Sequence, residues 1–165
     1  MLGLGGAAFE HAGLVPDRRA GDEVGVFVGA SVADYGTLVG DLDGPERRFT
    51  GTGNALSILA NRVSYTYDLR GPSLTVDTAC SSSLTALHLA CNSIALAECH
   101  TAIVGGVNVI LNSATTRTLH EAGMLSPSGA CRTFSSAADG YLRSDGAVVV
   151  VLKDAELAER DGDRI

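Results

Sequence analysis

Short, almost wholly apolar runs constrain the fold of this chain more than any other feature. Residues 24–30 (VGVFVGA), 101–110 (TAIVGGVNVI) and 147–153 (AVVVVLK) are rich in β-branched side chains, and a fourth run lies at 74–77 (LTVD). Continuous apolar runs of this length are typical of strands that are covered on both faces of a parallel sheet. The chain is therefore predicted to build a mostly parallel sheet.

Segments with helical periodicity separate these runs. Helices are predicted over residues 1–13, from about residue 54, from about residue 81 and over 113–122, and Asp154 is placed to cap a closing helix. Residues 31–53 and 123–146 have little periodicity and are expected to be loops. Strands that alternate with helices indicate the α/β class, with helices on both faces of the sheet. The positions expected to face the core are Leu4, Ala8, Phe9 and Ala12, then Leu56, Leu59, Ala60 and Val63, then Leu84, Leu87, Cys91 and Ile94.

Composition excludes several classes of function. The chain has 165 residues, of which 45% are hydrophobic, enough for one core. Its net charge is -7 with only 12 Lys and Arg, which argues against a nucleic-acid partner. No stretch approaches the roughly 20 apolar residues of a membrane span, and no signal peptide follows Met1. We expect a soluble cytoplasmic protein that does not bind a membrane.

The four cysteines, Cys80, Cys91, Cys99 and Cys131, show no CxxC pairing. Neither a zinc site nor a disulfide framework is predicted, and we expect free thiols. The pair Gly105 and Gly106 lies inside an apolar strand without a phosphate-binding pattern, so it is expected to allow close backbone approach. The residues therefore predict neither a metal site nor a directly bound cofactor.

Cys80 occupies the corner between a predicted strand and a predicted helix, in the segment VDTACSSSL. At the first turn of a helix, unpaired backbone N–H groups and the positive end of the helix dipole favour a thiolate. Such a thiolate can attack a thioester while nearby N–H groups stabilise the oxyanion. On spacing alone, the pattern favours the other interpretation, a tightly packed structural cysteine.

The other candidate residues have weaker settings. His11, His88, His100 and His120 are isolated in the sequence, and His88 lies about two helical turns beyond Cys80, too far along the helix for simple contact. Asp77 and Asp139 are expected to be solvated or to form turns. Cys91, Cys99 and Cys131 are interpreted as structural. None of these residues is assigned a catalytic role.

Seven segments, in this order, match a known family. They are GVFVGAS, TGTGNALSILANRVSY, LRGPSLTVDTACSSSLTALHLAC, AIVGGVNVIL, AGMLSPSGACRTF, AADGYLRSDGA and VVVLK. Over nearly its whole length the chain resembles the ketosynthase domain of modular type I polyketide synthases, which are thiolase-like β-ketoacyl synthases. The DTACSSS segment with Cys80 at its centre is the most discriminating of these motifs.

The resemblance implies decarboxylative Claisen condensation. Cys80 would take an acyl chain carried on the phosphopantetheine of an acyl carrier protein, with its own backbone N–H in the oxyanion hole. A malonyl-type extender would then attack the thioester as carbon dioxide leaves. The implied partners are the carrier protein, the rest of the synthase and a second copy that pairs through residues 74–77.

The resemblance also implies that residues 1–165 are a partial N-terminal domain of an αβαβα fold. The family's first strand and its C-terminal half are not in this sequence, and neither are histidine motifs of the VEAHGTGT and NIGHLEAAAG type. Two hypotheses follow. The residues belong to an acyltransferase whose remainder lies outside this sequence, or they form a truncated fragment that at most accepts an acyl group or binds a partner.

Overall fold

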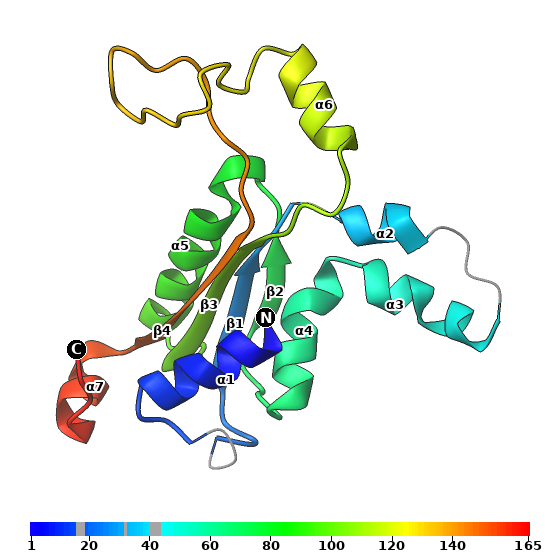
Figure 1. The fold of residues 1–165 in the computed structure, drawn as a ribbon. Coiled ribbons are helices and arrows are strands. Elements are labelled where there is room, and N and C mark those ends of the chain that lie inside the picture. The colour runs from blue at the N-terminus through cyan, green and yellow to red at the C-terminus, as the bar shows by residue number, and fades with distance from the viewer. Residues whose placement is uncertain (16–18, 32, 40–43) are drawn as a thin grey trace.

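The computed structural model describes residues 1–15, 19–31, 33–39 and 44–165. Four strands form one sheet, and helices lie on both of its faces (Figure 1). The strands are β1 (Val24–Gly29), β2 (Ser73–Val76), β3 (Thr101–Asn108) and β4 (Gly146–Lys153). The helices are α1 (Leu2–His11), α2 (Asp34–Val39), α3 (Thr50–Asn54), α4 (Ser57–Thr66), α5 (Ser82–Ala95), α6 (Ala114–Glu121) and α7 (Ala155–Asp161), with 3-10 turns η2 (Pro45–Phe49) and η3 (Ala79–Ser81).

The sheet is mixed, in the strand order β2-β1-β3-β4. β1 pairs in parallel with β2 and with β3, so that Phe27 lies between Leu74 and Val104. β4 is antiparallel to β3. The predicted α/β class and the mostly parallel, mixed sheet are confirmed, and the carboxyl ends of β1, β2 and β3 share one edge.

One face of the sheet packs against α1 and α4. Because side chains alternate along a strand, Val24, Val26 and Val28 of β1 all point to this face. They meet Phe9 of α1 and Val63 of α4 in a buried apolar cluster. Of the residues expected on the buried face of α1, Phe9 is buried, but Leu4 is 40% exposed. Gly5 is buried instead, close to the ring of Tyr67.

The opposite face packs against α5, and here two of the four expected core positions, Leu84 and Cys91, are wrong. The buried residues of α5 are Ser82, Ala86, Ala90 and Ser93, whereas Leu84 is 70% exposed and Cys91 is exposed. Leu87 and Ile94 are only partly buried at the edge of the cluster. A helix this close to a sheet accepts only small side chains at its contact face, which hydropathy alone does not indicate.

The expected loop over residues 31–53 is also wrong for the residues that are described, because α2, η2 and most of α3 lie within it. Residues 32 and 40–43 of that segment lie outside the described residues. These helices have five or six residues each, too few to be stable by propensity alone. The buried carboxylate of Asp34 holds α2 by accepting the backbone N–H groups of Leu111 and Asn112, at 3.1 and 3.4 Å.

The remaining elements lie close to their predicted positions. The helix expected from residue 54 begins at Ser57, because Ala55 is extended after α3. β2 covers residues 73–76 rather than 74–77. Asp154 caps α7 as predicted, its carboxylate accepting the N–H of Leu157 at 3.1 Å. α6 and the loop that follows it project beyond the carboxyl edge of the sheet (Figure 1).

Candidate active site

Cys80 lies in the turn between β2 and α5, at the carboxyl edge of the sheet. It is the middle residue of η3, and its thiol is exposed. The preceding residue, Ala79, has a φ of +54°, a left-handed conformation that non-glycine residues adopt rarely. Such conformations persist only where neighbouring contacts hold them, and they concentrate at functional sites.

Side chains from both ends of the turn hold this conformation. Asp77 accepts the N–H of Ala79 at 3.0 Å, and the hydroxyl of Ser81 donates to the carbonyl of Thr78 at 2.8 Å. The hydroxyl of Ser82 accepts the N–H of Thr78 at 2.9 Å and donates to the carbonyl of Ala79 at 2.6 Å. Asp77 is thus a turn-forming residue, as expected, and the hydroxyls of Ser81 and Ser82 brace the turn.

Two glycines let the start of α5 lie directly on the sheet. A Cβ at Gly29, the last residue of β1, would lie 2.4 to 2.6 Å from backbone atoms of Ser82 and Ser83. A Cβ at Gly106 of β3 would lie 2.8 Å from the Cβ of Ser83. The close approach expected of the Gly105 and Gly106 pair is present at Gly106, where it involves the Cβ of Ser83, whereas Gly105 faces the side chain of Met1. The close approach to backbone occurs at Gly29, which sequence reasoning missed although it ends a predicted strand.

The exposed thiol stands at the positive end of a helix of 14 residues. Among the hydrogen bonds of the described residues, none uses the N–H of Cys80 as a donor and none joins its thiol to an imidazole. His88 pairs instead with Asn92 on the outside of α5, at 3.0 Å. The turn therefore presents an exposed thiol and an available N–H donor side by side, without a bonded imidazole among the described residues.

The other three thiols have different surroundings. Cys99 is buried between α5 and the sheet, and its thiol lies 3.6 Å from the hydroxyl of Ser93. Cys91 and Cys131 are exposed, so the expected core position of Cys91 is wrong. Cys131 contacts the hydroxyl of Thr133 at 3.5 Å in the loop after α6. All four cysteines are free thiols.

Asp139 stabilises the loop after α6. It accepts a hydrogen bond of 2.6 Å from the hydroxyl of Ser126, and Arg132 lies 3.5 Å away. The hydrogen bonds from Ser126 and Ser128, with the charge of Arg132, lower the pKa of Asp139 below its ordinary value. Asp139 therefore has a structural role in this loop, as expected from the sequence.

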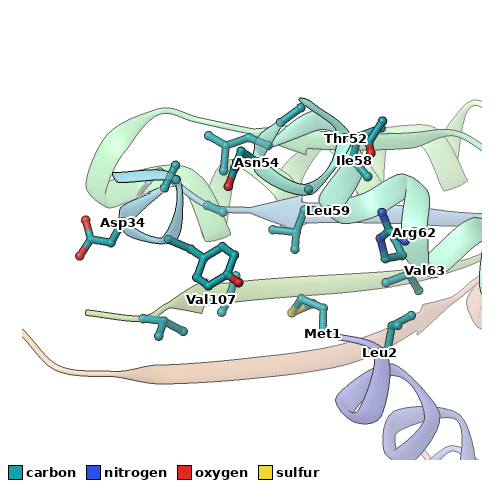
Figure 2. Close-up of a pocket in the computed structure, with 18 of the residues that line it drawn as sticks. Met1, Leu2, Asp34, Thr52, Asn54, Ile58, Leu59, Arg62, Val63 and Val107 are labelled. Carbon is teal, nitrogen blue, oxygen red and sulfur yellow. The ribbon is translucent and has the colours of Figure 1, made fainter. Parts of the chain in front are cut away.

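A pocket of about 590 Å³ opens on the other side of the sheet from α5. Figure 2 shows Leu59 of α4, Val107 of β3 and Met1 around its apolar part, with Asn54 and Arg62 among its polar residues. No residue of the Cys80 turn lines it. The pocket is therefore separate from the candidate nucleophile.

Two further findings concern the described residues alone. They contain no group of three or more His, Cys, Asp or Glu side chains arranged to hold a metal ion. None of their helices combines the length and the apolar character needed to cross a membrane.

Residues 2–158 match the model of the β-ketoacyl synthase N-terminal domain. The chain belongs to the β-ketoacyl synthase family. Solved ketosynthase domains share its fold: the ketosynthase from module 6 of the bacillaene synthase of Bacillus subtilis 168 aligns with a TM-score of 0.88 at 37% identity. An oxazolomycin ketosynthase domain from Streptomyces albus JA3453 aligns with a TM-score of 0.84 at 41% identity.

Curated relatives are polyketide synthases. The chain is 48% identical to a phenolphthiocerol/phthiocerol polyketide synthase of Mycobacterium tuberculosis, with 100% of the chain and 9% of that protein aligned. It is 46% identical to probable polyketide synthase 1 of Dictyostelium discoideum, with 100% of the chain and 5% of that protein aligned. For each of the two solved ketosynthases, the alignment includes 99% of this chain and 28% of the ketosynthase chain. The predicted family and thiolase-like fold are thus confirmed, and the relatives are parts of much larger synthases.

Proposed function

We propose that this chain supplies the acyl-accepting thiol, Cys80, of a ketosynthase that extends a polyketide by decarboxylative Claisen condensation. The observation that carries the proposal is the exposed thiol held by a left-handed turn at the start of α5, beside its own N–H, which has no acceptor within the described residues. Membership of the β-ketoacyl synthase family supports the same role.

The first step is acyl transfer. The thiolate of Cys80 attacks the carbonyl carbon of a thioester, forming a carbon–sulfur bond and an oxyanion that the N–H of Cys80 can stabilise. Collapse of the oxyanion breaks the bond to the carrier sulfur, which leaves as a thiolate and takes up a proton. We propose that the donor is the phosphopantetheine of an acyl carrier protein.

The second step forms the carbon–carbon bond. A malonyl-type thioester loses carbon dioxide, and the electron pair of the broken bond attacks the acyl carbonyl on Cys80. The carbon–sulfur bond to Cys80 then breaks and the thiolate is regenerated. This step needs a side chain that acts as a general acid or base, and no imidazole bonds Cys80 among the described residues. Residues outside this sequence would therefore complete the site, and residues 1–165 would form a partial ketosynthase domain.

A second copy of the domain is a further proposed partner. The resemblance implies pairing through residues 74–77, and β2 lies at an edge of the sheet, where β1 is its one strand partner among the described residues. An edge strand has unpaired N–H and C=O groups that a second strand can bond. Light scattering on the complete domain is expected to give the mass of a dimer, and a monomer alone would contradict this pairing.

The proposal is tested by acyl loading in the complete ketosynthase that contains these residues. Incubation with an acyl N-acetylcysteamine thioester, followed by intact-protein and peptide mass spectrometry, is expected to place one acyl group on Cys80. Cys80→Ala is expected to abolish loading. Cys91→Ala, which removes another exposed thiol of the same region, is the matched control and is expected to load normally. Undiminished loading of Cys80→Ala would refute the role of this thiol.

In the part of the chain that the structure describes, no imidazole bonds Cys80, which favours one alternative, a non-catalytic acyl acceptor. The same incubation distinguishes the two functions when a malonyl thioester is added. Loading at Cys80 without a condensed product, in the complete protein, supports the acceptor. Formation of the β-ketoacyl product supports the synthase.

A further inference from the structure

Ser82 differs from the other serines of the Cys80 turn because its side chain is enclosed. The residue is 4% exposed, whereas Ser81 and Ser83 are exposed. It lies between the turn and Gly29, which has no side chain to displace it. Its hydroxyl is fully used, accepting from the N–H of Thr78 and donating to the carbonyl of Ala79.

The carbonyl of Ala79 belongs to the same peptide unit as the N–H of Cys80. The backbone N–H of Ser82 also donates to this carbonyl, so Ser82 provides two of its hydrogen bonds. In a planar trans peptide the C=O and N–H bonds point in opposite directions. Holding the carbonyl toward the buried hydroxyl therefore directs the N–H of Cys80 away from Ser82.

This orientation matters because the N–H of Cys80 has no acceptor among the described residues. The residue directly before it, Ala79, has a left-handed backbone conformation. Such a conformation tends to relax when the contacts that restrain it are removed. An oxyanion donor is effective only when it is already aimed at the position where charge develops.

We propose that Ser82 is a positioning residue: its hydroxyl holds the Ala79–Cys80 peptide so that the N–H of Cys80 is aimed at the thioester oxyanion. This inference rests on the proposed function of Cys80. It assigns Ser82 no contact with the substrate.

The test compares two reactions of the same thiol in the complete ketosynthase. Loading from an acyl N-acetylcysteamine thioester passes through an oxyanion, whereas alkylation by iodoacetamide needs only the thiolate. Ser82→Ala is expected to slow loading about tenfold, the loss of roughly one hydrogen bond in the transition state. Alkylation of Cys80 should stay within about threefold of wild type. Ser83→Ala makes the same chemical change at an exposed neighbour and should leave both rates unchanged.

Three outcomes would overturn the inference. Loading of Ser82→Ala at the wild-type rate would do so, as would an equal fall of loading and alkylation, which indicates general disruption of the turn. If Ser82→Ala does not fold, Ser82→Thr keeps the hydroxyl and is expected to load within about threefold of wild type. The third outcome that would overturn the inference is a folded Ser82→Thr protein that is alkylated normally but loads about tenfold more slowly than wild type. Wild-type protein that does not load at all would instead refute the function of Cys80.

Discussion

The contact between Gly29 and the start of α5 makes a sharp prediction. A Cβ at this position would lie 2.4 Å from the N of Ser83 and 2.5 Å from the carbonyl carbon of Ser82. Comfortable contacts between such atoms are about 3.5–4.0 Å, so roughly 1 Å must be gained by moving α5 away from β1. Because the opposing atoms are backbone, no side chain can rotate to make room. We expect Gly29→Ala to lower the free energy of unfolding by about 1–3 kcal/mol.

The assay is urea unfolding followed by far-UV circular dichroism, with acyl loading of Cys80 measured in parallel. Gly3→Ala is the matched control, because nothing lies within 4 Å of its Cβ and alanine in a helix gains about 0.5–1 kcal/mol over glycine. Gly106→Ala should fall between the two, since its nearest neighbour is the side-chain Cβ of Ser83. A Gly29→Ala protein as stable as wild type that also loads at the wild-type rate would refute the argument that this contact sets the Cys80 turn.

Two further predictions concern groups away from Cys80. Asp34→Ala should lower the free energy of unfolding by about 1–3 kcal/mol, because two backbone N–H groups lose their acceptor. Asp34→Asn should lower it by less. Equal urea midpoints for wild type and Asp34→Ala would contradict this prediction. Lys153 bonds both Asp161, at 2.7 Å, and Asp163 near α7, and Lys153→Met should speed amide hydrogen exchange in α7. Although burial opposes it, these hydrogen bonds raise the pKa of Lys153 above its ordinary 10.5, and the bond from Lys153 lowers the pKa of Asp161 below 3.8. The stabilisation should thus persist between about pH 5 and pH 9, fading as the pH falls below 3.8 or rises above 10.5, and a loss of α7 protection near pH 7 would contradict it.

The local sequence determined most of the elements and the place of the proposed nucleophile. Apolar runs with many β-branched residues predicted the four strands. The expected cover on both faces holds along β1, but not along β4, where Val148 is 68% and Val150 is 42% exposed. The end of one such run next to a helical pattern put Cys80 at a corner, and the order of the family motifs identified the β-ketoacyl synthase fold.

Tertiary structure decided what surrounds that nucleophile. Which face of α5 is buried depends on how closely the sheet approaches, so Ala86 and Ala90 are inside while Leu84 is exposed. α2 is held by Asp34, whose carboxylate bonds residues distant in the sequence. The same holds for Ser82, whose hydroxyl bonds Thr78 and Ala79 and so braces the turn that holds Cys80. Local patterns indicate which segments are strands or helices, but contacts between segments far apart in the chain are set only when the sheet and its helices pack together.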